Sequence, residues 1–259
     1  MWHRYVTIGD SFTEGMSDPD PDVPGRYRGW AERLAEALSA RASGDFAYAN
    51  LAVRGRLLDD VVGPQLDAAL AMTPDLVSLI GGGNDLLRPG VDLDALADRL
   101  ESAVTRLRAS GADVLMGTPS DTAGGGLFGA LRGRHAMHTA NVFSIAQRHG
   151  AHVLNLWGFK ALLDWRMWGE DRIHLSSEGH RRVGLLAQTA LGVLDPQASL
   201  DAEWRTPLPP GPESSRVEAW RDNAAWARTD VAPWVQRRLR GDSSGDAVTA
   251  KRPDLLPFP

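Results

Sequence analysis

Short apolar runs alternate with segments of helical periodicity along this 259-residue chain, up to about residue 194. Each run is bounded by turn residues, as is typical of strands buried on both faces of a sheet. The alternation predicts an α/β fold, a doubly wound parallel sheet of five strands in a three-layer α/β/α sandwich. The expected strands are 4–8, 46–50, 76–80, 113–116 and 152–156, and the expected helices are 29–40, 57–71, 93–110, 132–149 and 176–194.

The chain changes in character after residue 195. Residues 206–212 include four prolines, which end helices and stiffen a linker. Beyond them, 216–227 and 232–239 read as short helices, and 241–259 reads as irregular. We expect these helices to dock on the main body, because soluble proteins rarely expose several tryptophans together. The predicted domains are 1–198 and a C-terminal extension, 199–259; the docking tryptophans would be Trp220, Trp226 and Trp234.

The composition excludes several classes of function. The sequence contains no cysteine, so disulfides, thiolate-bound zinc and a cysteine nucleophile are ruled out. A net charge of -5 gives no reason to expect nucleic acid or an anionic membrane as a partner. No stretch reaches the roughly 18 apolar residues of a membrane span. The first strand follows Met1 without a basic or apolar leader, so we expect a cytoplasmic protein.

Ser11 lies in the sequence Gly-Asp-Ser-Phe-Thr-Glu-Gly, directly after the first expected strand. In parallel sheets, ligands bind beyond the carboxyl ends of the strands. The loops after the first three strands begin near Gly9, Leu51 and Gly81, and all three carry polar or glycine-rich motifs. Ser11 is therefore a candidate nucleophile, although a serine here could also simply cap the turn.

Asp171 and His174 are three residues apart, immediately before the last expected helix. Histidine suits the task of a general base because its pKa lies near neutrality. A carboxylate fixes the imidazole tautomer and stabilises the imidazolium. We therefore predict a triad of Ser11, His174 and Asp171. The alternative is that Asp171 pairs with an arginine and His174 is an ordinary exposed histidine.

Acyl transfer also needs donors for the negative charge that develops on the carbonyl oxygen. The candidates are the backbone N–H groups of Ser11 and Gly55 and the side-chain amide of Asn84. Asp10 and Asp85 could suggest a metal site, but we expect them to hydrogen-bond loop backbone instead. No metal or cofactor is expected.

Taken together, four sequence blocks resemble the SGNH hydrolase family, also called GDSL esterases and lipases. The resemblance spans roughly residues 4–190 and implies a flavodoxin-like three-layer fold. It also implies that Ser11 is the nucleophile and an oxyanion donor, that Gly55 and Asn84 are further donors, and that His174 and Asp171 are the base and its orienting partner. The blocks are Gly9-Asp10-Ser11, Gly55, Gly83-Asn84-Asp85 and Asp171-x-x-His174.

Other candidate features have ordinary alternatives. His135 and His138 are three residues apart on an expected helix, but no carboxylate lies near them in sequence, so we expect a solvated helix face. Trp165 and Trp168 could wall a substrate pocket or pack in the core. Residues 122–128 could form a lid or a passive loop.

The expected function is hydrolysis of carboxylic esters of small molecules through an acyl-enzyme. The polar segment 16–26, expected at the rim of the site, favours short acyl or acetyl esters. The alternatives are a non-catalytic binding module, a thioesterase or lipase acting on longer acyl chains, and a metal-dependent hydrolase using Asp10 and Asp85. A second Gly-Asp-Ser at 241–243 follows no strand and is taken as coincidence.

Overall fold

The computed structural model describes residues 1–123, 126–195, 197–198, 203–209, 226, 228–229 and 244–258. Within them, no helix is both long and apolar enough to cross a bilayer. The strands are β1 (Arg4–Gly9), β2 (Ala47–Asn50), β3 (Leu76–Ile80), β4 (Asp113–Gly117), β5 (His152–Leu154) and β6 (Arg252–Pro257). The α-helices are α1 (Ser11–Glu14), α2 (Gly29–Ser39), α3 (Leu58–Asp60), α4 (Leu66–Ala71), α5 (Gly83–Leu86), α6 (Leu93–Ala109), α7 (Arg132–His149) and α8 (Ser177–Ala190).

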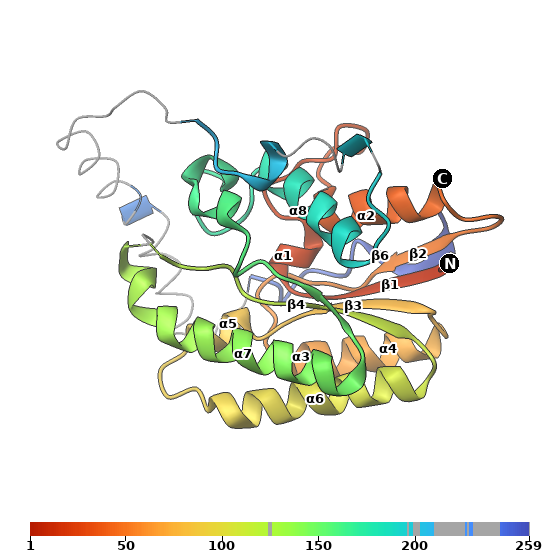
Figure 1. The fold of residues 1–259 in the computed structure, drawn as a ribbon, viewed down its shortest axis with the longest axis horizontal. Helices are drawn as coiled ribbons and strands as arrows, with labels where there is room; N and C mark the ends of the chain where they lie inside the picture. The colour runs from red at the N-terminus through yellow and green to blue at the C-terminus, as the bar shows by residue number, and fades with distance from the viewer. Residues whose placement is uncertain are drawn as a thin grey trace.

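The strands form one sheet in the order β5-β4-β3-β1-β2-β6 (Figure 1). The five expected strands all pair in parallel. The chain runs outward from β1 in both directions, which creates a switch point beside β1. Gly9 at the end of β1 is in register with Ile80 at the end of β3. The loops that follow these two strands therefore start side by side.

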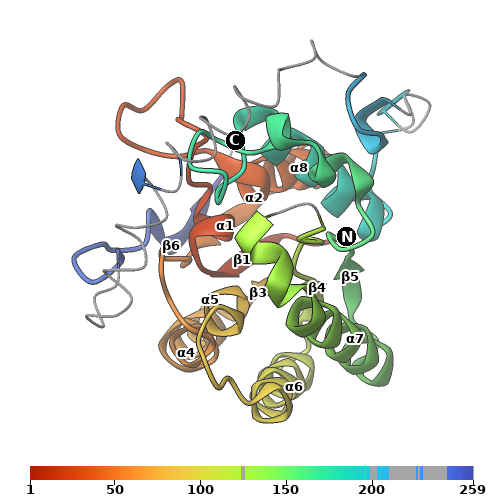
Figure 2. The same cartoon turned by 90° about the vertical axis from the view of Figure 1, so that its left-hand side faces the viewer.

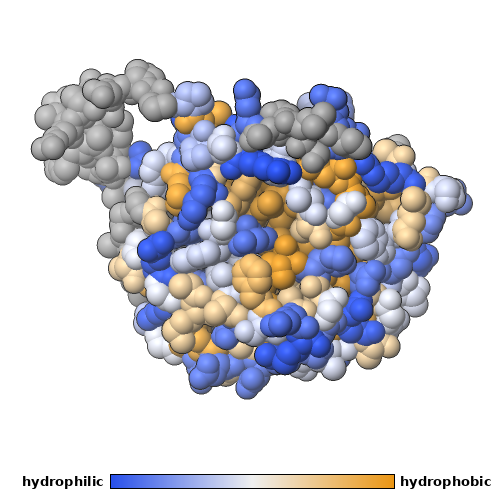
Figure 3. All heavy atoms as spheres, viewed as in Figure 1, coloured by the Kyte–Doolittle hydropathy of each residue, from blue (hydrophilic) through white to orange (hydrophobic). Residues whose placement is uncertain are grey.

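Helices cover both faces of the sheet, as predicted. α1, α2 and α8 lie on one face, and α4, α6 and α7 lie on the other (Figure 2). Tyr5 of β1 packs in the core with Trp30 and Leu34 of α2, whereas its neighbour Val6 packs in the opposite core with Leu100 of α6. On the face seen in Figure 3, apolar surface gathers between the two helical layers. Because both faces of the strands are buried, they read as continuous apolar runs.

The prediction of five strands and an irregular C-terminal tail was wrong. β6 adds a sixth strand, antiparallel to β2. Its sequence includes Pro253 and Pro257, and proline normally counts against a strand because it has no N–H to donate. Proline is tolerated at an edge, however, and β6 is the edge strand. Arg252 adds a hydrogen bond of 2.8 Å from Nε to the carbonyl oxygen of Tyr48 in β2.

The expected helix at 57–71 is helical but not uniform. A π-helical turn, Val61–Gln65, separates α3 from α4 and contains Pro64. Proline cannot donate to the α-helical hydrogen-bond ladder, which accounts for the irregular turn. The side chain of Gln65 accepts from the N–H of Gly9 at 2.8 Å and donates to its carbonyl at 3.0 Å. This helix thus holds the end of β1.

Several features of the C-terminal extension fall outside the described residues. They include the expected helix at 232–239, most of that at 216–227, Trp220, Trp234 and the second Gly-Asp-Ser at 241–243. The division into domains 1–198 and 199–259 stays a prediction.

Candidate active site

Ser11 is the first residue of α1, two residues beyond the end of β1. The carboxylate of Asp10 caps this helix by accepting the N–H of Phe12 at 3.1 Å. A Cβ atom at Gly9 would lie 2.7 Å from the carbonyl oxygen of Ile80, so only glycine allows β1 and β3 to end this closely. The strand, the glycine and the capped helix together present Ser11 at the rim of the sheet.

Asp171 and His174 are directly hydrogen-bonded. His174 Nδ1 donates to Asp171 Oδ2 over 2.6 Å. The other carboxylate oxygen, Oδ1, accepts the backbone N–H groups of Ile173 and His174, each at 3.0 Å. Burial raises the pKa of Asp171, but the hydrogen bonds from the His174 side chain and from the two N–H groups hold the pKa below its usual value. The ionised carboxylate therefore orients the imidazole, with Nδ1 protonated and Nε2 free to accept a proton.

The backbone between Asp171 and His174 is unusually bent. Arg172 has a φ of 53°, in the left-handed region that non-glycine residues seldom adopt. Such a conformation costs on the order of 1 kcal/mol and persists where surrounding contacts enforce it. Here the two bonds to Asp171 Oδ1 enforce it, so the tight turn is what brings the carboxylate of Asp171 and the imidazole of His174 together.

Asn84 links the turn of Ser11 to the loop of Gly55. Its Nδ2 donates to Asp10 Oδ2 at 3.1 Å and to the carbonyl of Arg56 at 3.0 Å. Gly55 has a φ of 73°, which a glycine adopts without strain. The three segments that carry the expected oxyanion donors are therefore joined by hydrogen bonds. The structure brings these segments to the same edge of the sheet.

Asp85 points away from this cluster. It is buried, and its Oδ2 accepts the N–H of Leu58 at 2.9 Å. Burial raises its pKa. Asp10 and Asp85 thus each accept a backbone N–H from the start of a short helix, Asp10 from α1 and Asp85 from α3. Among the residues that the structure describes, no three His, Asp or Glu side chains are grouped so as to hold a metal ion.

The expectation that His135 and His138 form a solvated face of α7 was wrong. The two side chains are 7% and 1% exposed. His138 Nε2 lies 3.3 Å from the carbonyl oxygen of Gly81, and burial lowers its pKa to about 4. A neutral imidazole packs as a flat, weakly polar ring, so it can turn inward while Arg132 on the same helix stays half exposed.

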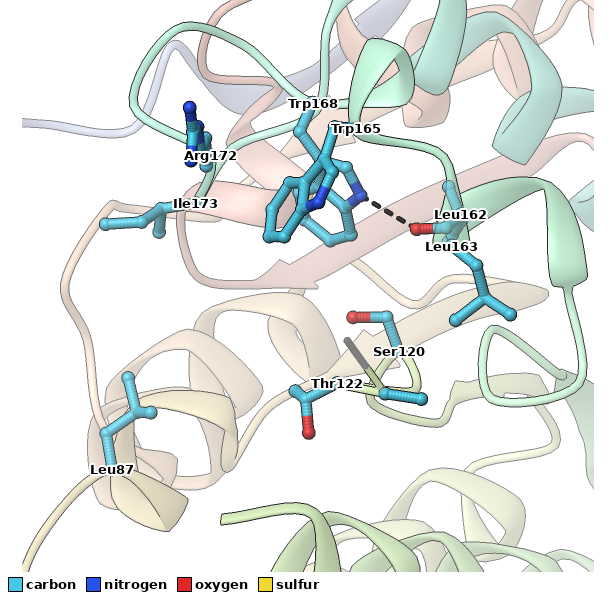
Figure 4. Close-up of a pocket in the computed structure, with 10 residues that line it drawn as sticks. Leu87, Ser120, Thr122, Leu162, Leu163, Trp165, Trp168, Arg172 and Ile173 are labelled. Carbon is cyan, nitrogen blue, oxygen red and sulfur yellow. Dashed lines mark hydrogen bonds between the residues drawn. The ribbon is translucent and has the colours of Figure 1, made fainter. Parts of the chain in front are cut away.

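Two adjoining cavities lie beside these residues. The first, of about 140 Å³, sits at the carboxyl ends of β1, β3 and β4, and its lining includes Asp10, Phe12 and His138. The second, of about 150 Å³, is mainly apolar (Figure 4). Both cavities are bordered by the same three residues, Ser120, Trp168 and Ile173.

Trp165 and Trp168 both line the second cavity, and Trp168 also packs against the core. Trp168 Nε1 donates to the carbonyl of Leu162 at 2.8 Å, which fixes the ring in place (Figure 4). Thr122 and Ala123, from the segment considered as a lid, lie on the opposite side. Residues 124–125 of that segment lie outside the described part of the chain. The cavity is thus lined by the segments that follow β3, β4 and β5.

Comparison with known families and structures agrees with this geometry. The GDSL-like lipase/acylhydrolase family model matches residues 7–182, which is more than half of the chain. The chain belongs to this family. It is therefore an ester-cleaving hydrolase. No curated protein matches the chain in sequence.

Solved structures of similar fold include esterases. Axe2, an acetylxylan esterase from Geobacillus stearothermophilus, is 21% identical with a TM-score of 0.63, covering 75% of this chain and 97% of its own. LAE5, an alpha/beta hydrolase from the metagenome of Lake Arreo, is 22% identical with a TM-score of 0.62, covering 74% and 96%. TesA is 22% identical with a TM-score of 0.60, covering 73% and 99%. At these identities the likeness shows the fold, the SGNH hydrolase fold.

Residues beyond the GDSL match also reach the site. Trp226 Nε1 donates to the carbonyl of Asp171 at 2.7 Å. The guanidinium of Arg172 lies 5.6 Å from the ring centre of Trp165 and 5.3 Å from that of Trp226.

Two further side chains near the site, Glu14 and Lys251, could not be identified from the sequence. The one signal for Lys251 is that it is one of two lysines in an arginine-rich chain.

Proposed function

We propose that this hydrolase cleaves carboxylic esters through an acyl-enzyme on Ser11. His174 Nε2 takes the proton of the Ser11 hydroxyl as Oγ attacks the ester carbonyl, and then gives it to the departing alcohol. Water cleaves the acyl-serine bond by the same route, with His174 again as the base. Asp171 keeps the imidazole in the correct tautomer throughout. The oxyanion would be held by the N–H groups of Ser11 and Gly55 and by Asn84, whose Nδ2 would exchange one of its two acceptors, Asp10 or Arg56, for the oxyanion.

The observation that carries this proposal is the border of the first cavity. Asp10 and Phe12, the two neighbours of Ser11, line it together with Ile173, the neighbour of His174. Asn84 is bonded to Asp10 at the same place. The segments that carry the proposed nucleophile, base and amide donor thus border one cavity, which supports acyl transfer at this edge of the sheet.

The acyl group is the part of the substrate for which the cavities provide room. The first cavity suffices for a short acyl group, as the sequence analysis expects. The adjoining apolar cavity would stay unfilled with acetate, and each buried methylene contributes about 0.8 kcal/mol. We therefore propose medium-length or aromatic acyl esters as the preferred class, with acetyl esters accepted more weakly.

The test is turnover of p-nitrophenyl acetate and p-nitrophenyl octanoate by the wild type and by Ser11→Ala. We expect Ser11→Ala to lose at least about 10³-fold in kcat on both esters. A matched control is Ser144→Ala, since Ser144 lies on the exposed side of α7. Turnover by the wild type should persist in the presence of a chelator. Full activity in Ser11→Ala, or loss of wild-type activity with the chelator, would contradict the proposal.

A further inference from the structure

Lys251 carries a buried ammonium group that contacts α1, the helix that begins with Ser11. Its side chain is only 10% exposed. Nζ donates to the carbonyl oxygens of Glu14, Tyr27 and Arg28 at 2.6, 2.9 and 2.8 Å, and it lies 2.8 Å from Glu32 Oε1. A buried charge is tolerated only when it is paired and hydrogen-bonded, and Lys251 meets both conditions.

Glu32 anchors Lys251 to the sheet. Its Oε1 also accepts the hydroxyl of Tyr48 at 3.0 Å and the side-chain amide of Asn50 at 3.1 Å. Asn50 in turn donates to the carbonyl of Thr13 in α1 at 3.2 Å. Lys251 therefore sits in a buried network that joins α2, the end of β2 and α1.

Glu14 connects this network to the candidate oxyanion loop. Glu14 is the last residue of α1, the four-residue helix that begins with Ser11. Its carbonyl accepts from Lys251, and its carboxylate accepts the backbone N–H of Arg54 at 2.7 Å and forms an ion pair with the Arg54 guanidinium. Arg54 immediately precedes Gly55. One residue thus ties the helix of the nucleophile to the loop of an expected donor.

The C-terminal segment 244–258 touches the same loop at a second point. A Cβ atom at Gly245 would lie 2.1 Å from the carbonyl oxygen of Arg54, so the two backbones are in tight contact. Arg56, on the other side of Gly55, donates to the carbonyl of Gly245 at 3.3 Å and lies 3.8 Å from the carboxylate of Asp246. The segment therefore contacts the residues on both sides of Gly55.

We propose that Lys251 is a positioning residue for ester hydrolysis, and that segment 244–258 sets the placement of Ser11 relative to Gly55. Lys251 donates to the carbonyl of Glu14 at the end of α1, and the turn at Gly245 contacts the Arg54–Gly55–Arg56 loop. The matched family range ends at residue 182, so this support belongs to the chain's own C-terminal extension. The inference rests on the proposed function, because the Ser11–Gly55 distance matters only if Gly55 stabilises an oxyanion.

The first test compares Lys251→Met with Lys160→Met, since Lys160 is the other lysine and is exposed. The rate on p-nitrophenyl acetate is measured per active site, with sites counted by a fluorophosphonate at saturation. We expect Lys251→Met to lose between about ten- and a hundredfold in kcat with KM nearly unchanged. Lys160→Met should match the wild type. A kcat for folded Lys251→Met within twofold of the wild type would overturn the inference.

A second set of variants separates positioning from stability. Lys251→Met leaves Glu32 as an unpaired buried carboxylate, so the double variant Glu32→Gln/Lys251→Met should regain melting temperature while kcat stays low. Recovery of kcat together with melting temperature would assign Lys251 a structural role only. Gly245→Ala should lower kcat through the other contact, with the exposed Ser244→Ala in the same turn as its control. Unchanged kcat in Gly245→Ala would overturn the role of the Gly245 contact and leave Lys251 as the one positioning contact of the proposal.

These outcomes are distinct from failure of the proposed function. If the wild type hydrolyses no ester, or if Ser11→Ala is fully active, the acyl-enzyme mechanism is wrong. If the wild type is active, Ser11→Ala is inactive and the Lys251 and Gly245 variants are unimpaired, the mechanism stands and the positioning role alone is wrong.

Discussion

His174 Nδ1 lies 2.6 Å from Asp171 Oδ2, and the other oxygen of the same carboxylate accepts two backbone N–H groups of the loop. One side chain therefore holds both the turn and the imidazole. Asp171 occupies Nδ1 of His174, so Nε2 is the nitrogen that the proposed mechanism uses for proton transfer. This arrangement leads to the first prediction.

Replacing Asp171 by asparagine should reduce kcat by about 10⁴-fold, because the amide can favour the wrong imidazole tautomer. The asparagine oxygen can still accept the N–H groups of Ile173 and His174, so the loop should keep its shape. Steady-state kinetics on p-nitrophenyl acetate, with circular dichroism to verify folding, provide the measurement. A loss of less than tenfold would mean that Asp171 does not orient the base.

Gly55→Ala should lower kcat by at least about tenfold. An alanine at a φ of 73° is strained by about 1–2 kcal/mol, and relief of that strain moves the N–H that would face the oxyanion. Gly63→Ala is the control, because nothing lies within 4 Å of a Cβ at Gly63 and its φ is not positive. The control should leave kcat unchanged. Equal effects of the two substitutions would argue against a role for the Gly55 N–H.

Trp165→Ala should alter the preference for acyl length. Trp165 lines the apolar cavity and is 44% exposed, so its removal opens the wall without emptying a closed core. We expect kcat/KM for the octanoate ester, relative to acetate, to fall by about tenfold. Phe143→Ala, which removes an aromatic ring of similar exposure (42%) from α7, should not change this ratio.

A matched series identifies which part of the substrate the cavity holds. Acyl length is varied on p-nitrophenyl esters, and alcohol length is varied on alkyl acetates. If Trp165→Ala changes only the alcohol series, the cavity binds the leaving group and the proposed acyl preference is wrong.

His138 predicts a loss of stability in mild acid. Burial lowers its pKa to about 4, from an ordinary value of 6.5. Between these values the unfolded chain binds a proton that the folded chain does not, so the free energy of unfolding falls as the pH drops from 6.5 to 4. For one such group the loss amounts to about 3 kcal/mol at pH 4.

Denaturant unfolding of the wild type and His138→Gln across this pH range tests the prediction. The variant should show a shallower dependence on pH, whatever its absolute stability. The dependence should not vanish, because His180 is also buried with a pKa lowered to about 4. Parallel curves for the two proteins would show that His138 titrates normally in the folded state.

Most of the sheet could be predicted because its strands are buried on both faces and their apolar character is continuous in the sequence. The candidate site could be predicted for a related reason. Its residues lie in short blocks at strand ends, and topology alone gathers those ends at one edge. The contact between Asp171 and His174 could be predicted from the local sequence alone, because one turn of chain brings the two side chains together.

Features that depend on distant partners could not be predicted. β6 contains two prolines, and its pairing is decided by the open edge of β2. His135 and His138 follow Arg132 and Arg134 in sequence, and only the packing of α7 against the strand ends turns them inward. Lys251 donates a hydrogen bond to Glu14, 237 positions away, and no local sequence pattern predicts such a contact.

The central claim is a covalent acyl-enzyme on Ser11. The most direct measurement is labelling with a fluorophosphonate, followed by mass analysis of the peptide that carries the adduct. The wild type should gain one phosphonyl group per chain on the peptide containing Ser11, with loss of esterase activity in the same proportion. Ser11→Ala should gain none. An adduct on another residue that abolishes activity, or full esterase activity in a completely labelled protein, would contradict the claim.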